Sequence, residues 1–202
     1  MHTKDIKFDT LAPSYDTGWA GRFSQRFYNL LLSVIELDPG AKVLDVGCGT
    51  GALLQRIAEQ TPICGYGIDT EEMMLVEARK KLPDMTFVKA RSERIPYPDA
   101  TFDVVVACMA FHHFTNTKAF AAEASRVLRP GGCVYIVDPY LPPALRRVIN
   151  LIIRSLGLTG KFFTSMGMHR IFREHDVYVE TVEIDGYAQA VCLIKAGVDF
   201  DA

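Results

Sequence analysis

Short apolar runs alternate with helical patterns along most of the chain. From residue 41 onward the runs are KVLDV, CGYGID, MTFVKA, FDVVVACM and CVYIVD, and most are followed by a stretch with apolar residues at helical spacing. Runs of this length, bounded by glycine or aspartate and joined by helices, are typical of buried parallel strands. The pattern predicts an α/β domain in three layers, with a mostly parallel sheet in the middle.

The two ends of the chain depart from this alternation. Near the start, apolar residues at helical spacing predict a helix over residues 21–36. Near the end, VYVETVEIDGYAQAVCLIKA consists of two extended runs joined around Asp185-Gly186, which predicts an antiparallel hairpin at the edge of the sheet. We expect a single domain with four parts: an N-terminal lid and helix (1–40), a ligand-binding core (41–138), a variable insertion (139–176) and the hairpin (177–196).

Composition narrows the class of protein. The 202 residues are 49% hydrophobic and 23% charged, which suits one globular domain. A net charge of −2 argues against a nucleic-acid partner. The five cysteines are scattered singly, so we expect reduced core residues and no metal site. The first ten residues lack the apolar run of a signal peptide, and no stretch is long and apolar enough to span a bilayer, so we expect a cytoplasmic location.

The stretch VLDVGCGTG, residues 43–51, is a strand that runs into three glycines and a helix start. Glycines at this turn let the backbone approach a ligand closely. Asp45, just before the turn, would suit an ammonium group better than a pyrophosphate. Asp69 ends the next strand, where an acid accepts hydrogen bonds from ribose hydroxyls. Together they favour S-adenosylmethionine as ligand; the alternative is an ordinary turn, with Asp69 as a helix cap.

Six motifs in order resemble one family. FDTLAPSYD, VLDVGCGTG, GIDTEEMM, ARSERIPYPDATFDVV, FHHF and RVLRPGG, between residues 8 and 138, are similar to motifs of the class I S-adenosylmethionine-dependent methyltransferases, in the branch of the ubiquinone and menaquinone biosynthesis enzymes. The resemblance implies a Rossmann-like sheet of seven strands with the last strand antiparallel. It also implies methyl transfer from S-adenosylmethionine, with S-adenosylhomocysteine as product.

The resemblance implies a place for the methionine and ribose parts of this cofactor. The loop of Gly47, Cys48 and Gly49 would lie against the methionine part. Asp45 would face its ammonium group through water, and Asp69 would bind the ribose hydroxyls.

The resemblance also implies an adenine pocket. Thr70 and Met73 would lie beside the adenine, and the backbone of Ser92 would read its edge. The chain departs from the family at Arg91, where relatives frequently carry aspartate. The backbone carbonyl of Met109 would lie against the cofactor ammonium.

Two further segments have two interpretations each. His112 and His113 follow the fourth strand; either they pack and stabilise their loop, or His113 is the catalytic base that accepts the acceptor's proton. Tyr15 and Asp16, followed by Trp19, belong either to a lid that closes over the cofactor, with Tyr15 as the contact, or to an aromatic anchor for the first helix.

Substrate choice is expected to depend on the insertion at 139–176. A helical pattern begins at Pro142-Pro143, with Leu145, Val148, Ile149, Ile152 and Leu156 on one face. That face predicts a roof over a small apolar or aromatic acceptor, a peripheral contact with a membrane, or core packing. Asp138-Pro-Tyr140 resembles a motif of DNA amino-methyltransferases only superficially, because it follows the fifth strand and lacks a second proline.

Three functions are therefore weighed. The leading hypothesis is a methyltransferase that acts on a small molecule. The second is a non-catalytic S-adenosylmethionine-binding sensor or partner subunit. The third, a nicotinamide-dependent oxidoreductase, is disfavoured by the glycine spacing and by Asp45. The oligomeric state is not predicted.

Overall fold

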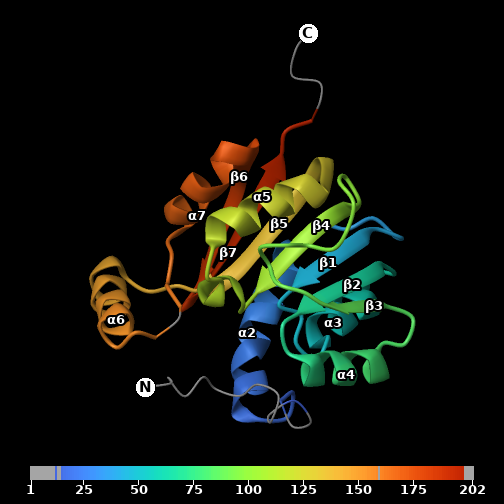
Figure 1. Cartoon of the computed structure of the whole chain (residues 1–202), viewed down its shortest axis with the longest axis horizontal. Coiled ribbons are helices and arrows are strands. Elements are labelled where there is room, and N and C mark those ends of the chain that lie inside the picture. The colour runs from blue at the N-terminus through green and yellow to red at the C-terminus, as the bar shows by residue number, and fades with distance from the viewer. Residues whose placement is uncertain (1–11, 13–14, 159, 198–202) are drawn as a thin grey trace.

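A single seven-stranded sheet forms the centre of the molecule (Figure 1). The computed structural model describes residue 12, residues 15–158 and residues 160–197. The strand order is β3-β2-β1-β4-β5-β7-β6. The strands are β1 (Lys42–Val46), β2 (Cys64–Asp69), β3 (Thr86–Lys89), β4 (Phe102–Cys108), β5 (Leu128–Pro139), β6 (Val177–Asp185) and β7 (Ala188–Lys195).

The pairing confirms the predicted direction of the strands. β1 to β5 pair in parallel, and β7 is antiparallel to both of its neighbours, β5 and β6. The hairpin predicted around Asp185-Gly186 is the β6–β7 pair. The last strand thus lies between β5 and β6 and runs against the rest of the sheet.

Helices cover both faces of the sheet, as the three-layer prediction requires. One core joins the sheet to α2, α3 and α4, and the other joins it to α5 and α7. The described helices are α2 (Trp19–Val34), α3 (Ala52–Gln60), α4 (Glu72–Lys81), η2 (Phe111–His113), α5 (Thr117–Val127), α6 (Pro143–Ser155), α7 (Ser165–Phe172) and η3 (Arg173–His175). The helix predicted at 21–36 is α2, shifted by two residues.

Burial on both sides explains the uninterrupted apolar run of β4. Val104 and Val106 belong to the first core, whereas Val105 and Ala107 belong to the second. Because alternate side chains of a strand point to opposite faces, a strand covered on both faces needs apolar residues at every position. The buried positions 104–108 of β4, VVVAC, satisfy this requirement, and the polar Asp103 near its start is only half-buried.

Contacts between α2 and the hairpin fix the N-terminal helix on the sheet. Phe23 stacks on Tyr187 with ring centroids 5.5 Å apart. The Arg26 guanidinium donates to Asp185 at 2.5 Å and lies 4.9 Å from the Tyr187 ring centroid. Phe27, which is fully buried, continues the contact into the core. The N-terminal helix α2 and the C-terminal hairpin therefore stabilise each other.

Helix α6 is the exception to the layered packing. It buries none of its side chains, and in Figure 1 it lies to one side of the sheet. The core-packing interpretation of this helix is therefore wrong. Among the described residues no helix combines the length and the apolar character needed to cross a bilayer.

The turn after β1 depends on a glycine backbone. Gly47 has φ of +82°, and a Cβ at this position would lie 2.6 Å from Cβ of Ala110. Gly40, before β1, has a similar φ of +85° but no atom within 4 Å of such a Cβ. The two positions share the backbone requirement and differ in the space around them.

Replacing Gly47 by alanine should destabilise the protein more than replacing Gly40. Each substitution places an alanine in the left-handed region, at about 1–2 kcal/mol. Gly47→Ala should lose about 1–3 kcal/mol more of the free energy of unfolding, because its methyl group overlaps Ala110. Urea denaturation of both variants measures the difference, and equal losses would contradict the close contact.

Candidate functional site

The carboxyl ends of four parallel strands meet at one edge of the sheet. β1 ends before Gly47, β2 ends at Asp69, β4 ends before Met109, and β5 carries Asp138 near its end. β1 lies between β2 and β4. From β1 the chain order of the strands therefore runs to β2 and β3 on one side, and to β4 and β5 on the other. In such sheets ligands bind outside the carboxyl ends, where the strand order reverses.

Asp45 is a buried carboxylate with one oxygen that has no hydrogen-bond partner among the described residues. The residue is 2% exposed, and its Oδ1 atom accepts no hydrogen bond from the described residues. Burial raises the pKa of Asp45 from 3.8 to about 8, and the Asp69 carboxylate adds to the rise. A buried acid without a counter-charge is costly when ionised. A cationic group at this position would favour the ionised form.

Asp69 fixes the glycine loop from the neighbouring strand. Its Oδ2 accepts the Gly49 N–H at 2.8 Å, and its Oδ1 accepts the Glu71 N–H at 2.9 Å. A carboxylate oxygen can accept more than one hydrogen bond, so these two contacts are compatible with hydrogen bonds from ligand hydroxyls. The N-cap residue of α4 is Glu71 and not Asp69, so the helix-cap interpretation of Asp69 is wrong. The ribose contact stays a prediction.

The N-terminal segment lies against this loop. The Asp16 carboxylate accepts the Thr50 hydroxyl at 2.6 Å and the Lys81 ammonium at 2.5 Å. Burial raises the pKa of Tyr15, which Asp16 and Asp69 also influence. Residues 1–11 and 13–14 of the predicted lid lie outside the described residues. Sequence reasoning did not anticipate the contacts of Thr50 and Lys81, because a threonine and a lysine carry no signal in the local sequence of a contact across the fold; in the structure Thr50 is buried.

The predicted adenine side is more open. Thr70 is exposed and Met73 is 42% exposed, whereas Ser92 is buried. Arg91 donates to Glu93 at 3.3 Å and to Thr115 at 3.2 Å. The Arg91 side chain is thus held at the surface, and only the buried Ser92 segment borders the interior.

Two more predicted cofactor contacts lie at the same edge. Cys48 is buried, and burial raises the pKa of its thiol well above the ordinary value. Met109 has φ of +56°, a conformation that non-glycine residues seldom adopt, and its N–H donates to the Val137 carbonyl at 2.8 Å. Such strain often occurs at functional sites.

The two histidines differ in their partners. Nδ1 of His112 lies 3.0 Å from Oδ1 of Asp138, and both residues are buried. The His112 ring also stacks on Phe162, with centroids 5.4 Å apart. His113 keeps an exposed surface, yet desolvation by the surrounding protein lowers its pKa from 6.5 to about 4, with His112 as the second cause.

Asp138 is the functional candidate that sequence reasoning set aside. The sequence feature that could have identified it is its position near the carboxyl end of β5, because the histidines follow the neighbouring strand β4. Because β4 and β5 are parallel neighbours, their carboxyl ends lie together. A pair of this kind can orient an imidazole and stabilise its protonated form.

The geometry fits the cofactor that the sequence predicts. The unpartnered Asp45 offers a counter-charge for an ammonium group, and Asp69 offers acceptors for hydroxyls. Gly49, in the middle of the glycine loop, has no atom within 4 Å of the place of a Cβ, which leaves room there for a close backbone approach. His112 and His113 lie next to this edge, where an imidazole can accept a proton from an acceptor.

Comparisons with known proteins agree with the predicted family. A family described as "Methyltransferase domain" matches residues 43–132. The ubiquinone/menaquinone biosynthesis C-methyltransferase UbiE of Geobacter sulfurreducens is 30% identical over 81% of this chain and 69% of its own length. The demethylmenaquinone methyltransferase of Chlorobaculum parvum is 31% identical over 74% of this chain and 66% of its own length.

The structural comparison extends over nearly the whole chain. The methyltransferase solved with the Trm112 methyltransferase activator of Haloferax volcanii has a TM-score of 0.81 at 18% identity, and the match covers 96% of this chain and 100% of that one. This likeness shows a shared fold. The chain spans about half to two thirds of the curated relatives first matched. Fold, site and sequence agree: the chain belongs to the S-adenosylmethionine-dependent methyltransferase family.

Proposed function

We propose that this protein transfers a methyl group from S-adenosylmethionine to a small apolar molecule. The observation that carries the proposal is the buried Asp45 beside the glycine loop, whose Oδ1 has no hydrogen-bond partner in the described part of the chain, with Asp69 at the end of the next strand. The cofactor supplies an electrophilic methyl group on a sulfonium. The protein's own residues then have to bind it, orient the acceptor and exclude water.

The cofactor-binding roles follow the site geometry. Asp45 faces the ammonium group, and Asp69 binds the ribose while it holds Gly49. The buried Ser92 segment lies at the adenine side. Tyr15 and the Asp16 segment, tied to Thr50, cover the methionine side. These assignments use the residues predicted from the sequence in the arrangement that the fold gives them.

His112 is the better candidate for the general base. Asp138 can accept the Nδ1 proton of His112, which leaves Nε2 free to take a proton from an acceptor. His113, the residue chosen from the sequence, has a pKa lowered to about 4, which makes it a weak proton acceptor. The contacts therefore support a catalytic role for His112 more than for His113.

The insertion connects the acceptor side to helix α6. Asn150 of α6 donates to the Phe162 carbonyl and accepts the Phe162 N–H, both at 2.9 Å. The backbone N–H of Lys161 donates to the His112 carbonyl at 2.8 Å. Phe162 in turn stacks on His112. The proposed roof, helix α6, is therefore linked to His112 through Phe162.

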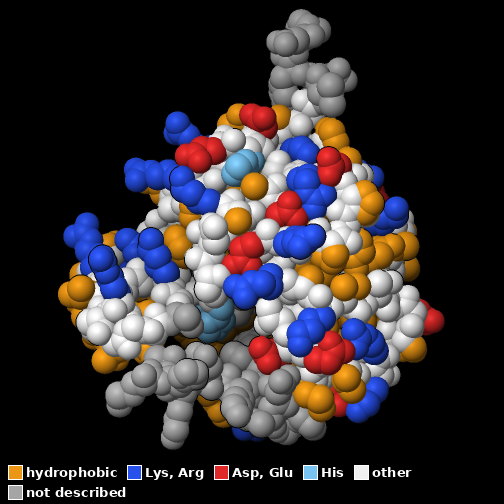
Figure 2. Space-filling view, viewed as in Figure 1, with side chains coloured by type: hydrophobic (Ala, Val, Ile, Leu, Met, Phe, Trp, Pro, Cys, Tyr) orange, Lys and Arg blue, Asp and Glu red, His pale blue; other side chains and the backbone are white. Residues whose placement is uncertain are grey.

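An apolar acceptor and a membrane contact are supported by the surface of α6. Leu145, Val148, Leu151 and Ile152 are 48–67% exposed. Residues 139–173 contain six Lys and Arg and no Asp or Glu, in a chain of net charge −2. Figure 2 shows the basic and hydrophobic side chains side by side over α6. A helix with this composition suits an anionic membrane surface, where apolar molecules such as the quinones of the relatives dissolve.

Binding of S-adenosylhomocysteine should release a proton from Asp45. Below about pH 8 the free protein keeps Asp45 protonated, and an ammonium group lowers that pKa on binding. Affinity should therefore rise with pH up to about 8, by as much as about tenfold per pH unit. Calorimetry in two buffers of different ionisation enthalpy measures the released proton.

Two variants make this test specific. Asp45→Asn should weaken binding and abolish the proton release, whereas the exposed Asp84→Asn should change neither. NAD serves as the comparison ligand and should not compete. Tight, pH-independent binding to Asp45→Asn would refute the role of Asp45, and cofactor binding without any methyl transfer would favour the sensor hypothesis.

Substitution of His112 should slow methyl transfer without loss of cofactor. His112→Asn should lower kcat by about 100- to 10,000-fold, the usual contribution of a general base. Asp138→Asn should lower it less, and His113→Asn least. The assay uses labelled S-adenosylmethionine and a short-chain demethylated quinol, with S-adenosylhomocysteine affinity as the control. The reverse order, with His113→Asn most damaged, would restore the sequence prediction.

Binding to membranes should depend on the charges and the apolar face of α6. Arg147→Gln/Arg154→Gln should weaken sedimentation with phosphatidylglycerol-rich vesicles by about 30-fold, at about 1 kcal/mol per charge. Leu151→Gln should also weaken it. The charge-matched Lys80→Gln/Lys118→Gln variant, on α4 and α5, should bind normally. Equal binding to neutral vesicles, or no effect of the α6 variants, would contradict the contact.

A further inference from the structure

Two cysteines far apart in the sequence lie together on one face of the sheet. Cys133 is on β5 and Cys192 on the adjacent antiparallel strand β7. In the register of this pair Cys192 lies opposite Tyr135, and Cys133 opposite Ile194. The two cysteines are therefore diagonal neighbours, and in an antiparallel sheet such residues point to the same face.

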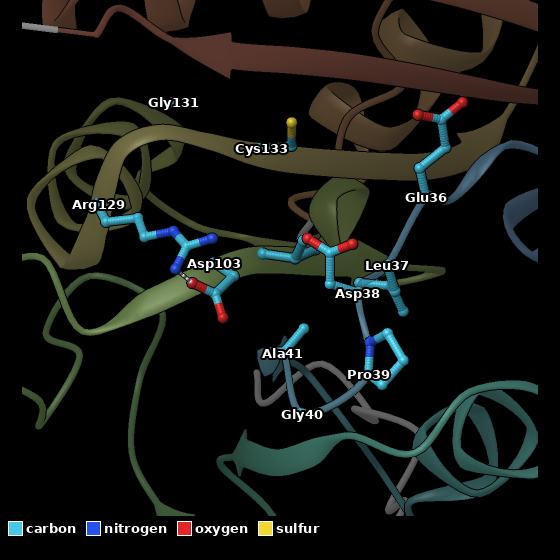
Figure 3. Close-up of a pocket in the computed structure, with 11 residues that line it drawn as sticks. Glu36, Leu37, Asp38, Pro39, Gly40, Ala41, Asp103, Arg129, Gly131 and Cys133 are labelled. Atoms are coloured by element: carbon cyan, nitrogen blue, oxygen red, sulfur yellow. Dashed lines mark ion pairs between the residues drawn. The ribbon is translucent and has the colours of Figure 1, made fainter.

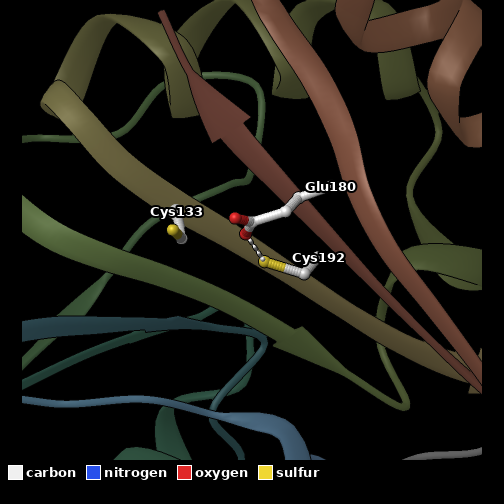
Figure 4. Close-up of side chains that lie close together, drawn as sticks. All are labelled: Cys133, Glu180 and Cys192. Carbon is white, nitrogen blue, oxygen red and sulfur yellow. Dashed lines mark hydrogen bonds between the residues drawn. The ribbon is translucent and has the colours of Figure 1, made fainter. Parts of the chain in front are cut away.

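A strand irregularity brings an acidic side chain to the same place. The β6–β7 register shifts between Val179 and Thr181, so Glu180 is an extra residue in its strand. Bulges of this kind redirect a side chain. Oε2 of Glu180 lies 3.4 Å from Sγ of Cys192 (Figure 4). Three adjacent strands thus contribute one polar group each to one point.

The spacing of these groups suits a tetrahedral cation. The three ligand atoms, two sulfurs and a carboxylate oxygen, all lie within 4.8 Å of one another. Around a zinc ion with bonds of about 2.0–2.3 Å, tetrahedral ligand atoms are roughly 3.5 Å apart. The Cys192–Glu180 separation already has this value, and an exposed glutamate can adjust its rotamer.

A cavity borders one member of the cluster, Cys133, at the opposite end of the sheet from the candidate cofactor site. Cys133 lines a cavity of about 340 Å³ together with Glu36, Asp103 and Arg129 (Figure 3). This cavity lies at the amino ends of β1 and β4, where Ala41 and Asp103 are found. It leaves room for a water molecule as the fourth ligand, and Glu36 lies on the same cavity wall as a further carboxylate.

We propose that Cys133, Glu180 and Cys192 form a binding site for a thiolate-preferring divalent cation such as Zn²⁺. Two sulfurs and one carboxylate select zinc over magnesium or calcium, which prefer oxygen ligands alone. Binding forms two metal–sulfur bonds and one metal–oxygen bond, and the two thiol protons pass to solvent. The cation would fasten the C-terminal hairpin to β5, independently of any methyl transfer.

The test is metal binding by the reduced, chelator-treated full chain. Co²⁺ serves as a spectroscopic probe, because thiolate ligation gives an intense near-ultraviolet band and tetrahedral geometry gives strong visible bands. Zn²⁺ affinity follows from competition with a chromophoric chelator. We expect one metal ion per chain, and slower amide exchange in β6 and β7 when Zn²⁺ is bound.

Single substitutions identify the ligands. Cys133→Ser and Glu180→Gln should each weaken Zn²⁺ binding by more than about 100-fold. Loss of a residue that only supports a metal ligand already costs about 10- to 100-fold, and loss of a ligand itself costs more. Cys64→Ser is the matched control, because Cys64 is an exposed thiol at the start of β2, and it should bind like the parent chain. Because Cys192 is buried and its substitution could impair folding, Cys133→Ser is the deciding variant.

Two results would overturn the proposal. One is the absence of the thiolate–cobalt band in the parent chain at micromolar Co²⁺. The other is Zn²⁺ binding that survives Cys133→Ser and Glu180→Gln, which would place the metal elsewhere on the protein. Circular dichroism of each variant confirms that the sheet is retained, so loss of binding reports on the ligands.

Discussion

The candidate site depends on one buried carboxylate for which the described residues supply no counter-charge. Asp45 lies on β1, with β2 and β4 on either side, and its Oδ1 accepts no hydrogen bond from the described residues. Burying an unpaired acid opposes folding, and the protein meets this by keeping it protonated at neutral pH. A cationic ligand removes that penalty. The same feature that weakens the free protein therefore makes ligand binding favourable.

Much of the fold follows from patterns of neighbouring residues. The apolar runs located the strands, because strands covered on both faces leave little room for polar side chains. The hairpin followed from Asp185-Gly186 between two extended runs. The glycine spacing and Asp69 located the cofactor edge, since these residues lie within one β-α-β segment. Such features need only local sequence.

Contacts between residues that are far apart in the sequence could not be predicted from it. Asp138 was set aside with the motif Asp138-Pro-Tyr140, which follows the fifth strand and lacks a second proline, and the sequence alone does not say that its carboxylate meets His112 across β4 and β5. The meeting of Cys133 and Cys192 depends on an antiparallel register, and that of Glu180 on a shift in it. The exposure of α6 was equally hidden, because an amphipathic pattern does not specify which surface covers the apolar face. Pairing register, rather than residue type, determines these sites.

The Asn150–Phe162 hydrogen bonds make α6 and the histidine pair parts of one mechanical unit. Phe162 stacks on His112, while Asn150 holds the same residue to the helix. Any partner that fixes α6 in one position therefore also biases the orientation of the imidazole. Coupling between sites is reciprocal in free energy, so if the acceptor binds beside His112 and α6 contacts a membrane, as proposed, each of these events changes the affinity of the other by the same factor. A bound acceptor would in this way strengthen the contact of α6 with the membrane from which the acceptor came, and release of the product would weaken that contact again.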